Sequence, residues 1–142
     1  MTNPYYEGVL QLRNPTDEVI EYIHYRVTHD KKGKITQEKK VKGGTDFYFD
    51  SQHYLQALGK KLNKKFAGEF KVSPTLKTVS KVTSKRVYRV TVLFKVYPFQ
   101  PGDIIHSKEG DLHLLSFKKK FMVKNLKTGR KQWMSVEELK KA

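Results

Sequence analysis

The residues best suited to do chemistry in this sequence are lysines and arginines that recur in short clusters. One cluster lies on a predicted helix and two lie at predicted turns: Lys60, Lys61, Lys64 and Lys65; Lys118, Lys119 and Lys120; and Lys127, Arg130 and Lys131. Lysines four residues apart on a helix repel each other, by roughly a few tenths of a kcal/mol per pair. A phosphate backbone would relieve that repulsion, so the clusters favour contact with RNA. A solvated helix face and soluble turns remain the simpler alternatives.

The whole chain shares this excess of positive charge. Its 142 residues include 29 Lys and Arg against 14 Asp and Glu, which gives a formal net charge of +15. Repulsion among so many positive charges opposes compact folding, and such an excess is typical of proteins with a polyanionic partner. Nucleic acid is the leading candidate for that partner. An anionic membrane surface and solubility alone stay open as other reasons for the charge. No apolar run is long enough to span a membrane, and we expect no membrane partner.

Residues of the types that perform catalysis or bind metals are sparse. The sequence has no cysteine, and neither GxxxxGK[ST] nor GxGxxG occurs. No histidine has a second histidine or a carboxylate at a convincing metal-ligand spacing. We therefore expect a protein that is not an enzyme, with no metal, cofactor or small-molecule substrate. Tyr48 is a candidate for stacking on an RNA base, because Phe47 and Phe49 point to the other side of its strand.

Residues 1–97 have the pattern of an α+β domain. Strands are predicted over residues 6–13, 35–42, 45–50, 69–81 and 86–97, and helices over residues 17–29 and between Ser51 and Gly68. Thr16 and Ser51 are the expected N-caps, and Gly68 is the expected residue just beyond the second helix. The order β-α-β-β-α-β-β predicts a mixed sheet with two helices on one face. A turn is expected at residues 82–85.

Residues 98–142 have a different, all-β pattern that follows a Pro- and Gly-rich boundary at residues 98–102. Short strands are predicted over residues 103–107, 112–117, 121–126 and 132–135. Strands of this length and spacing predict a small SH3-like or OB-like β-barrel. At about 45 residues, such a barrel is near the lower limit for folding alone, so we expect it to dock on the first domain.

Four segments of the first domain resemble a known family: YYEGVLQLR at residues 5–13, VKGGTDFYF at 41–49, LGKKLNKKFAGEFKVS at 58–73 and VYRVTVLF at 87–94. In order and spacing they are similar to the central region of the large (60S) ribosomal subunit export adaptor family, also called nonsense-mediated decay protein three. The resemblance implies binding to the large ribosomal subunit and its rRNA near the tRNA exit region, during late assembly. Separately, the absence of cysteine and therefore of disulfides fits a cytoplasmic location.

The second domain is similar, more faintly, to the SH3-like domain of translation factor 5A. The similarity lies in PGDII at residues 101–105 and NLKTGRK at residues 125–131. That factor carries a modified lysine in a loop that corresponds to residues 116–120, but the glycine and histidine pattern of that loop is missing here. We therefore expect only a basic tip. Members of the adaptor family also carry zinc-binding CxxC pairs, and the lack of cysteine predicts a truncated or short, archaeal-like relative without that region.

Together these features predict a non-catalytic RNA-binding module that docks on the large ribosomal subunit as an assembly or quality-control factor. The expected mode is recognition of phosphates and shape in folded RNA. Two other functions stay open. One is a general translation-factor module that binds tRNA or mRNA, and the other is an interaction module for a ribosomal protein.

Overall fold

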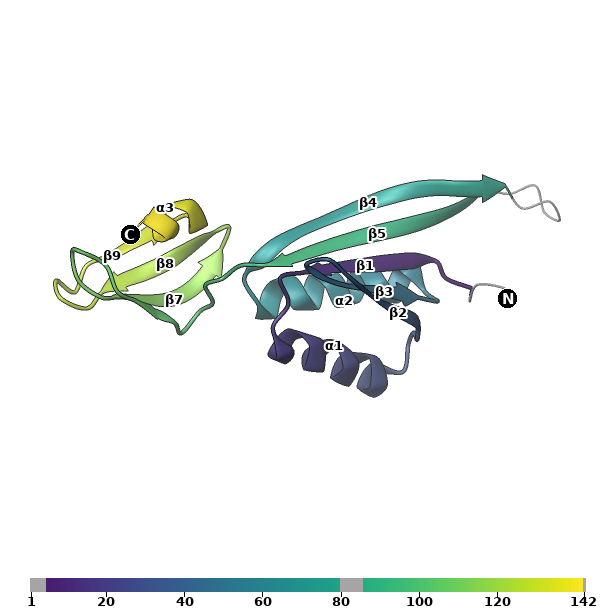
Figure 1. The fold of residues 1–142 in the computed structure, drawn as a ribbon, viewed down its shortest axis with the longest axis horizontal. Helices are drawn as coiled ribbons and strands as arrows, with labels where there is room; N and C mark the ends of the chain where they lie inside the picture. The colour runs from purple at the N-terminus through teal and green to yellow at the C-terminus, as the bar shows by residue number, and fades with distance from the viewer. Residues whose placement is uncertain (1–4, 80–85, 142) are drawn as a thin grey trace. The chain divides into compact units, whose positions relative to one another are not determined.

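The chain forms two compact units, Met1–Val96 and Tyr97–Ala142, each built around its own sheet (Figure 1). The structure is a computed structural model that describes residues 5–79 and 86–141. That the units are separate domains divided between residues 97 and 98, and that the second docks on the first, remain predictions. None of the helices in the described chain has the length and apolar character that crossing a membrane requires.

The first unit is a five-stranded sheet with two helices on one face (Figure 1). Its elements are β1 (Gly8–Arg13), α1 (Asp17–Asp30), β2 (Ile35–Val41), β3 (Gly44–Phe49), α2 (Gln52–Lys65), β4 (Gly68–Val79) and β5 (Arg86–Val96). The strand order is β2-β3-β1-β5-β4, with β1 and β5 parallel and the other neighbours antiparallel. The predicted α+β class and mixed sheet are confirmed. The expected turn at residues 82–85 falls on residues 80–85, which lie outside the described residues.

Both helices of the first unit begin at the predicted caps. The Thr16 hydroxyl accepts a hydrogen bond from the backbone N–H of Val19 at 3.3 Å. The Ser51 hydroxyl accepts one from the backbone N–H of Tyr54 at 3.2 Å. Each cap satisfies a backbone donor that the first helical turn leaves without a partner, which typically stabilises a helix by about 1 kcal/mol.

The end of α2 differs from the prediction. The helix ends at Lys65, its C-cap Phe66 is extended, and Gly68 is the first residue of β4. A Cβ atom at Gly68 would lie 2.7 Å from the carbonyl oxygen of Lys95 and 2.8 Å from the ring of Phe94. The position excludes a side chain because β4 and β5 approach closely there, as glycines in strands often allow. The prediction that Gly68 follows the helix in a C-terminal cap was therefore wrong.

The core of the first unit lies between the helices and one face of the sheet. Phe47 and Phe49 of β3 are both buried, as their alternation predicted. The predicted helical stripe is also buried, and it consists of Leu55, Leu58, Leu62 and Phe66. Since alternate strand residues point to opposite faces, the second face of the sheet carries the remaining side chains, which are polar or only partly buried.

The second unit is a small antiparallel sheet with one short helix. Its elements are β6 (Ile104–Ile105), β7 (Leu112–Lys118), β8 (Lys120–Asn125), β9 (Lys131–Met134) and α3 (Val136–Lys141), and the strand order is β6-β7-β8-β9. One face is buried around Leu114, Phe121 and Val123. The prediction of a small, barrel-like β unit after the α+β part is confirmed, and its assignment as SH3-like or OB-like remains a prediction.

Candidate nucleic-acid interface

The lysine cluster on α2 contains two kinds of residue. Lys60 and Lys64 are exposed and form no ion pair in the described part of the chain. Lys65 is exposed as well, and its ammonium lies 5.3 Å from the centre of the Tyr22 ring. Lys61 differs from the other three because its Nζ lies 3.0 Å from Oδ2 of Asp30 in α1. Three of the four lysines are thus available to a phosphate, whereas Lys61 joins the two helices.

Asp30 is the centre of the contact between α1 and α2. Its carboxylate is only 9% exposed and accepts hydrogen bonds from Arg26 at 2.7 Å, from the Tyr54 hydroxyl at 2.9 Å and from Lys61 at 3.0 Å. Burial raises the pKa of this carboxyl, but the hydrogen bonds from Lys61 and Tyr54 and the charges of Lys61 and Arg26 outweigh burial and lower the pKa overall. Burial and the nearby carboxylate raise the pKa of the Tyr54 hydroxyl, which therefore remains a donor.

The other two predicted clusters lie at hairpin tips of the second unit. Lys118 and Lys120 face each other as the last pair of β7 and β8, and Lys119 between them has a left-handed backbone with φ 63°. The second tip joins β8 to β9 and turns at Gly129, with φ 78°. Its predicted cations are Lys127, Arg130 and Lys131. All six predicted cations of the two tips are exposed, and the described chain offers none of them an acidic partner within ion-pair distance.

Tyr48 lies on the sheet face that the helices leave uncovered. Its ring meets the ring of Tyr6 edge-on, with 4.9 Å between the ring centres. The guanidinium of Arg89 lies 4.1 Å from the centre of the Tyr6 ring and donates from Nε to the Tyr6 carbonyl at 3.1 Å. Tyr48 is therefore one member of an aromatic and cationic cluster and is only partly exposed. Its stacking on an RNA base remains a prediction.

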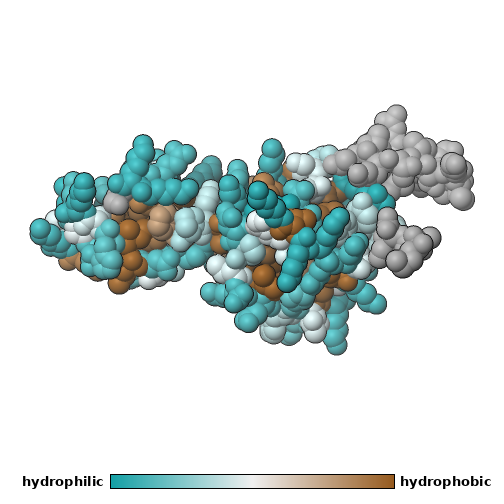
Figure 2. All heavy atoms as spheres, viewed as in Figure 1, coloured by the Kyte–Doolittle hydropathy of each residue, from teal (hydrophilic) through white to brown (hydrophobic). Residues whose placement is uncertain are grey.

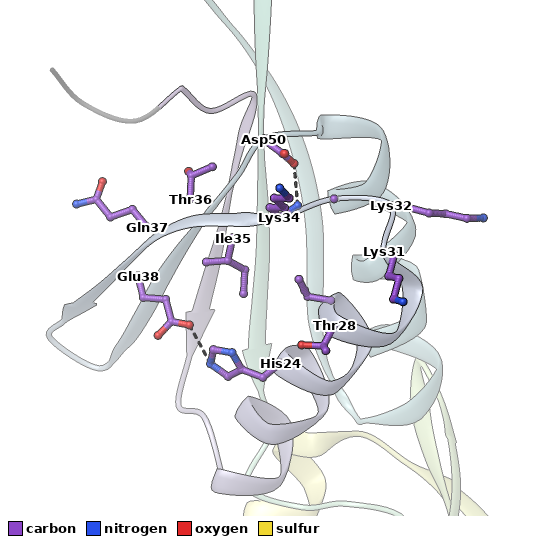
Figure 3. Close-up of a pocket in the computed structure, with 12 residues that line it drawn as sticks. His24, Thr28, Lys31, Lys32, Lys34, Ile35, Thr36, Gln37, Glu38 and Asp50 are labelled. Atoms are coloured by element: carbon purple, nitrogen blue, oxygen red, sulfur yellow. Dashed lines mark hydrogen bonds and ion pairs between the residues drawn. The ribbon is translucent and has the colours of Figure 1, made fainter.

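A pocket of about 880 Å³ opens between the end of α1 and β2 (Figure 3). His24 Nε2 and Glu38 Oε1 lie 2.9 Å apart on its wall, and the backbone N–H of Lys34 donates to Asp50 at 2.8 Å. The side chain of Lys32 extends away from both pairs (Figure 3). The first pair joins α1 to β2, and the second joins the residue before β2 to the residue after β3, so these polar groups do not converge on one point. Across the residues that the structure describes, no three His, Asp or Glu side chains are grouped to hold a metal ion.

The first unit matches a known protein family. The family described as NMD3, second domain, matches residues 5–96. The chain belongs to the NMD3 family. None of the curated proteins matches it. All four segments that carried the resemblance lie within the matched residues, so the resemblance is confirmed at the level of the family.

The NMD3 match divides the predicted interface. The lysines of α2 and Tyr48 lie within residues 5–96, on elements that belong to the NMD3 second domain. The two basic tips lie beyond residue 96, in the unit whose similarity to translation factor 5A remains a prediction. The family match therefore gives no support to an RNA contact by the tips.

The sequence reasoning missed one exposed aromatic residue near these tips. Trp133 is the only tryptophan of the chain, and its side chain is 49% exposed on β9. It lies between Gln132 and Met134, so the alternation of a strand predicts that it faces away from both. That alternation, next to the lysines of the tip, was the signal in the sequence that could have found it.

Proposed function

We propose that this chain binds folded RNA of the large ribosomal subunit as a non-catalytic assembly or quality-control factor. Membership of the NMD3 family supports a ribosomal partner, because the family is that of a ribosome-associated adaptor of the large subunit. The proposal includes a cytoplasmic location and contact with rRNA near the tRNA exit region. It also includes an archaeal-like character for this member of the family.

The observation that carries the proposal is a set of cations without acidic partners. Of the ten lysines and arginines predicted to contact RNA, nine are exposed and form no ion pair in the described chain, and only Lys61 is paired. Repulsion within each cluster favours a polyanion that brings negative charge to it. Each phosphate contact releases counterions, so binding must weaken steeply with salt.

The test is sedimentation of the purified chain with separated ribosomal subunits over a series of salt concentrations. We expect binding to large subunits with a log–log slope of about −0.7 to −0.9 for each phosphate contact. Replacing Lys60 and Lys64 with Gln should make the slope shallower by about 1 to 2 without lowering the melting temperature. Replacing Lys39 and Lys40 of β2 with Gln is the matched control, since these lysines are equally exposed and lie outside the predicted sites.

Four results would contradict the proposal. Equal weakening by the two double substitutions would mean that only net charge matters. A lower melting temperature with unchanged binding would make the α2 lysines structural. Displacement of the chain from large subunits by free tRNA, at tRNA concentrations that saturate the chain, would point to the general translation-factor module. Binding to large subunits that survives nuclease treatment or high salt would point to a ribosomal protein as the partner.

A further inference from the structure

The outer face of the second unit combines exposed apolar side chains with lysines. Alternation along β8 and β9 turns Phe121, Val123 and Met134 toward the buried side, where α3 packs, and places Met122 and Trp133 on the opposite face as a direct cross-strand pair. Trp133 is 49% exposed. In Figure 2, hydrophobic side chains reach the surface of this unit among hydrophilic ones. Among the described residues, no other aromatic ring stacks on the indole and no cation lies over it.

Basic residues flank Trp133 on both sides along the same face. One row across the sheet joins His113, Lys124 and Lys131, and it lies two residues from Trp133 along β9. On the other side of the Met122–Trp133 pair, Lys118 pairs with Lys120 at the hairpin tip. Residues on the same face of neighbouring strands lie roughly 5 Å apart, so these side chains form one continuous surface. The paired rows of this face contain no acidic residue.

We propose that this face binds a single-stranded segment of RNA, with one unpaired base stacked on Trp133 and the adjoining phosphates held by Lys124 and Lys131. An aromatic ring flanked by cations is the arrangement that binds unpaired nucleotides, because every base presents a π face and every linkage carries a negative charge. The inference rests on the proposed function and deepens it. It names the chemistry that the second unit recognises and adds a residue that the lysine clusters did not include.

A protein partner fits this face less well. Tryptophan is common at the centres of protein interfaces, but lysine is depleted there, because burying its ammonium without a partner costs free energy. Here four lysines surround the indole without an acid in the same rows. A phosphodiester backbone supplies the missing negative charge while its bases cover the apolar surface, so charge complementarity selects RNA as the occupant.

The first experiment uses the intrinsic fluorescence of the full chain, because Trp133 is its only tryptophan. The probes are a ten-nucleotide oligoadenylate and inorganic polyphosphate of the same charge. We expect the oligoadenylate to quench Trp133 fluorescence, since a base stacked on the indole contacts it directly. Polyphosphate should bind without comparable quenching, because it has no base. Equal quenching by the two probes would overturn the stacking proposal and leave a contact by charge alone.

The second experiment measures binding of labelled oligoadenylate by fluorescence anisotropy. Replacing Trp133 with Leu should weaken binding by about 5- to 100-fold, as expected for the loss of one stacked base, whereas Trp133→Phe should retain most of the affinity. The salt dependence should stay the same in both variants, because no phosphate contact is lost. Unchanged affinity in Trp133→Leu, or equal losses in the Leu and Phe variants, would overturn the proposal.

Failure of this inference can be distinguished from failure of the proposed function. If the Trp133→Leu variant binds large subunits normally, and replacing Lys118, Lys119 and Lys120 with Gln weakens that binding, RNA docking stands and stacking is refuted. If the wild-type chain binds neither subunits nor oligoadenylate, both fall. A change in Trp133 emission with RNA-free ribosomal proteins, without any change with oligoadenylate, would overturn the inference in favour of a protein contact.

Discussion

The two units carry positive charge at a similar density but arrange it differently. Residues 1–96 contain 19 Lys and Arg against nine Asp and Glu, and residues 97–142 contain ten against five. In the first unit, Arg13, Arg26 and Lys61 each form an ion pair with an aspartate. In the described residues of the second unit, the one ion pair joins His106 to Asp111, and no lysine or arginine takes part. Net charge alone therefore does not tell which cations are free for a partner.

The two units also differ in the size of their cores. Fifteen buried residues form the core cluster in the described part of the first unit, among them five aromatic residues. The buried apolar residues of the second unit are Leu112, Leu114, Phe121, Val123 and Leu139. A small core leaves a small stability, and unpaired like charges reduce it further. A polyanion that binds only the folded second unit would stabilise it, so binding and folding are linked most strongly there.

The largest expected effect tests whether the units are independent. Replacing the fully buried Phe121 with Ala should cost about 3–5 kcal/mol, which is comparable with the whole stability of so small a unit. The second unit should unfold while the first stays folded. Trp133 emission reports on the second unit alone, and far-UV circular dichroism reports mainly on the helices of the first. A single joint transition by both signals would show that the two units fold as one domain.

A smaller effect is expected at the ion-pair centre of the first unit. Asp30→Asn should lower the free energy of unfolding by about 1–3 kcal/mol, because three donors lose a charged acceptor. Binding to large subunits should persist, since no free lysine is removed. Urea unfolding of both proteins checks the first expectation and sedimentation checks the second. Loss of binding with unchanged stability would show that Asp30 belongs to the interface.

The same variant has a defined dependence on pH. The pKa of Asp30 in the folded protein lies below the ordinary value of 3.8. The ionised Asp30 therefore contributes fully to the free energy of unfolding above pH 3.8, and this contribution is lost as the pH falls through the lower folded pKa. The stability difference between wild type and Asp30→Asn should therefore be constant above about pH 5 and shrink in stronger acid. A difference that stays constant down to the acid transition would contradict the lowered pKa.

The smallest expected effect separates two neighbouring lysines of α2. Lys65 lies over the ring of Tyr22 at 5.3 Å, whereas Lys60 is exposed without such a contact in the described chain. Lys65→Gln should lower the free energy of unfolding by about 0.5–1 kcal/mol, the usual size of an exposed cation–π contact. Lys60→Gln should leave it unchanged. Equal unfolding midpoints for the two variants in urea would remove the distinction between them.

Most of the fold could be predicted because local rules and tertiary packing agree. Thr16 and Ser51 cap helices because their hydroxyls reach backbone donors three residues later, a contact that needs no distant partner. The alternation of Phe47, Tyr48 and Phe49 likewise predicted which side faces the core. Gly68 was misassigned because its role depends on Phe94 and Lys95 of another strand, and no local pattern reports that contact.

The candidate site was harder to predict than the fold. Four lysines in one helical segment look alike in the sequence, yet Lys61 meets an aspartate that lies 31 residues earlier. Trp133 could not be predicted from the basic clusters, because it follows the last of them in the sequence and belongs to none. Its importance became visible only when the strand register placed it beside Lys124 and Lys131 on one face.

The parallel pairing of β1 with β5 has a consequence for the order of folding. The register joins residues 8–13 to residues 90–95, so the centre of the first sheet consists of the first and last strands of that unit. A nascent chain therefore cannot complete this sheet until nearly all of the unit has left the exit tunnel. Until then the edge of β1 that pairs with β5 stays open to other partners, and closure over so long a loop is intrinsically slow.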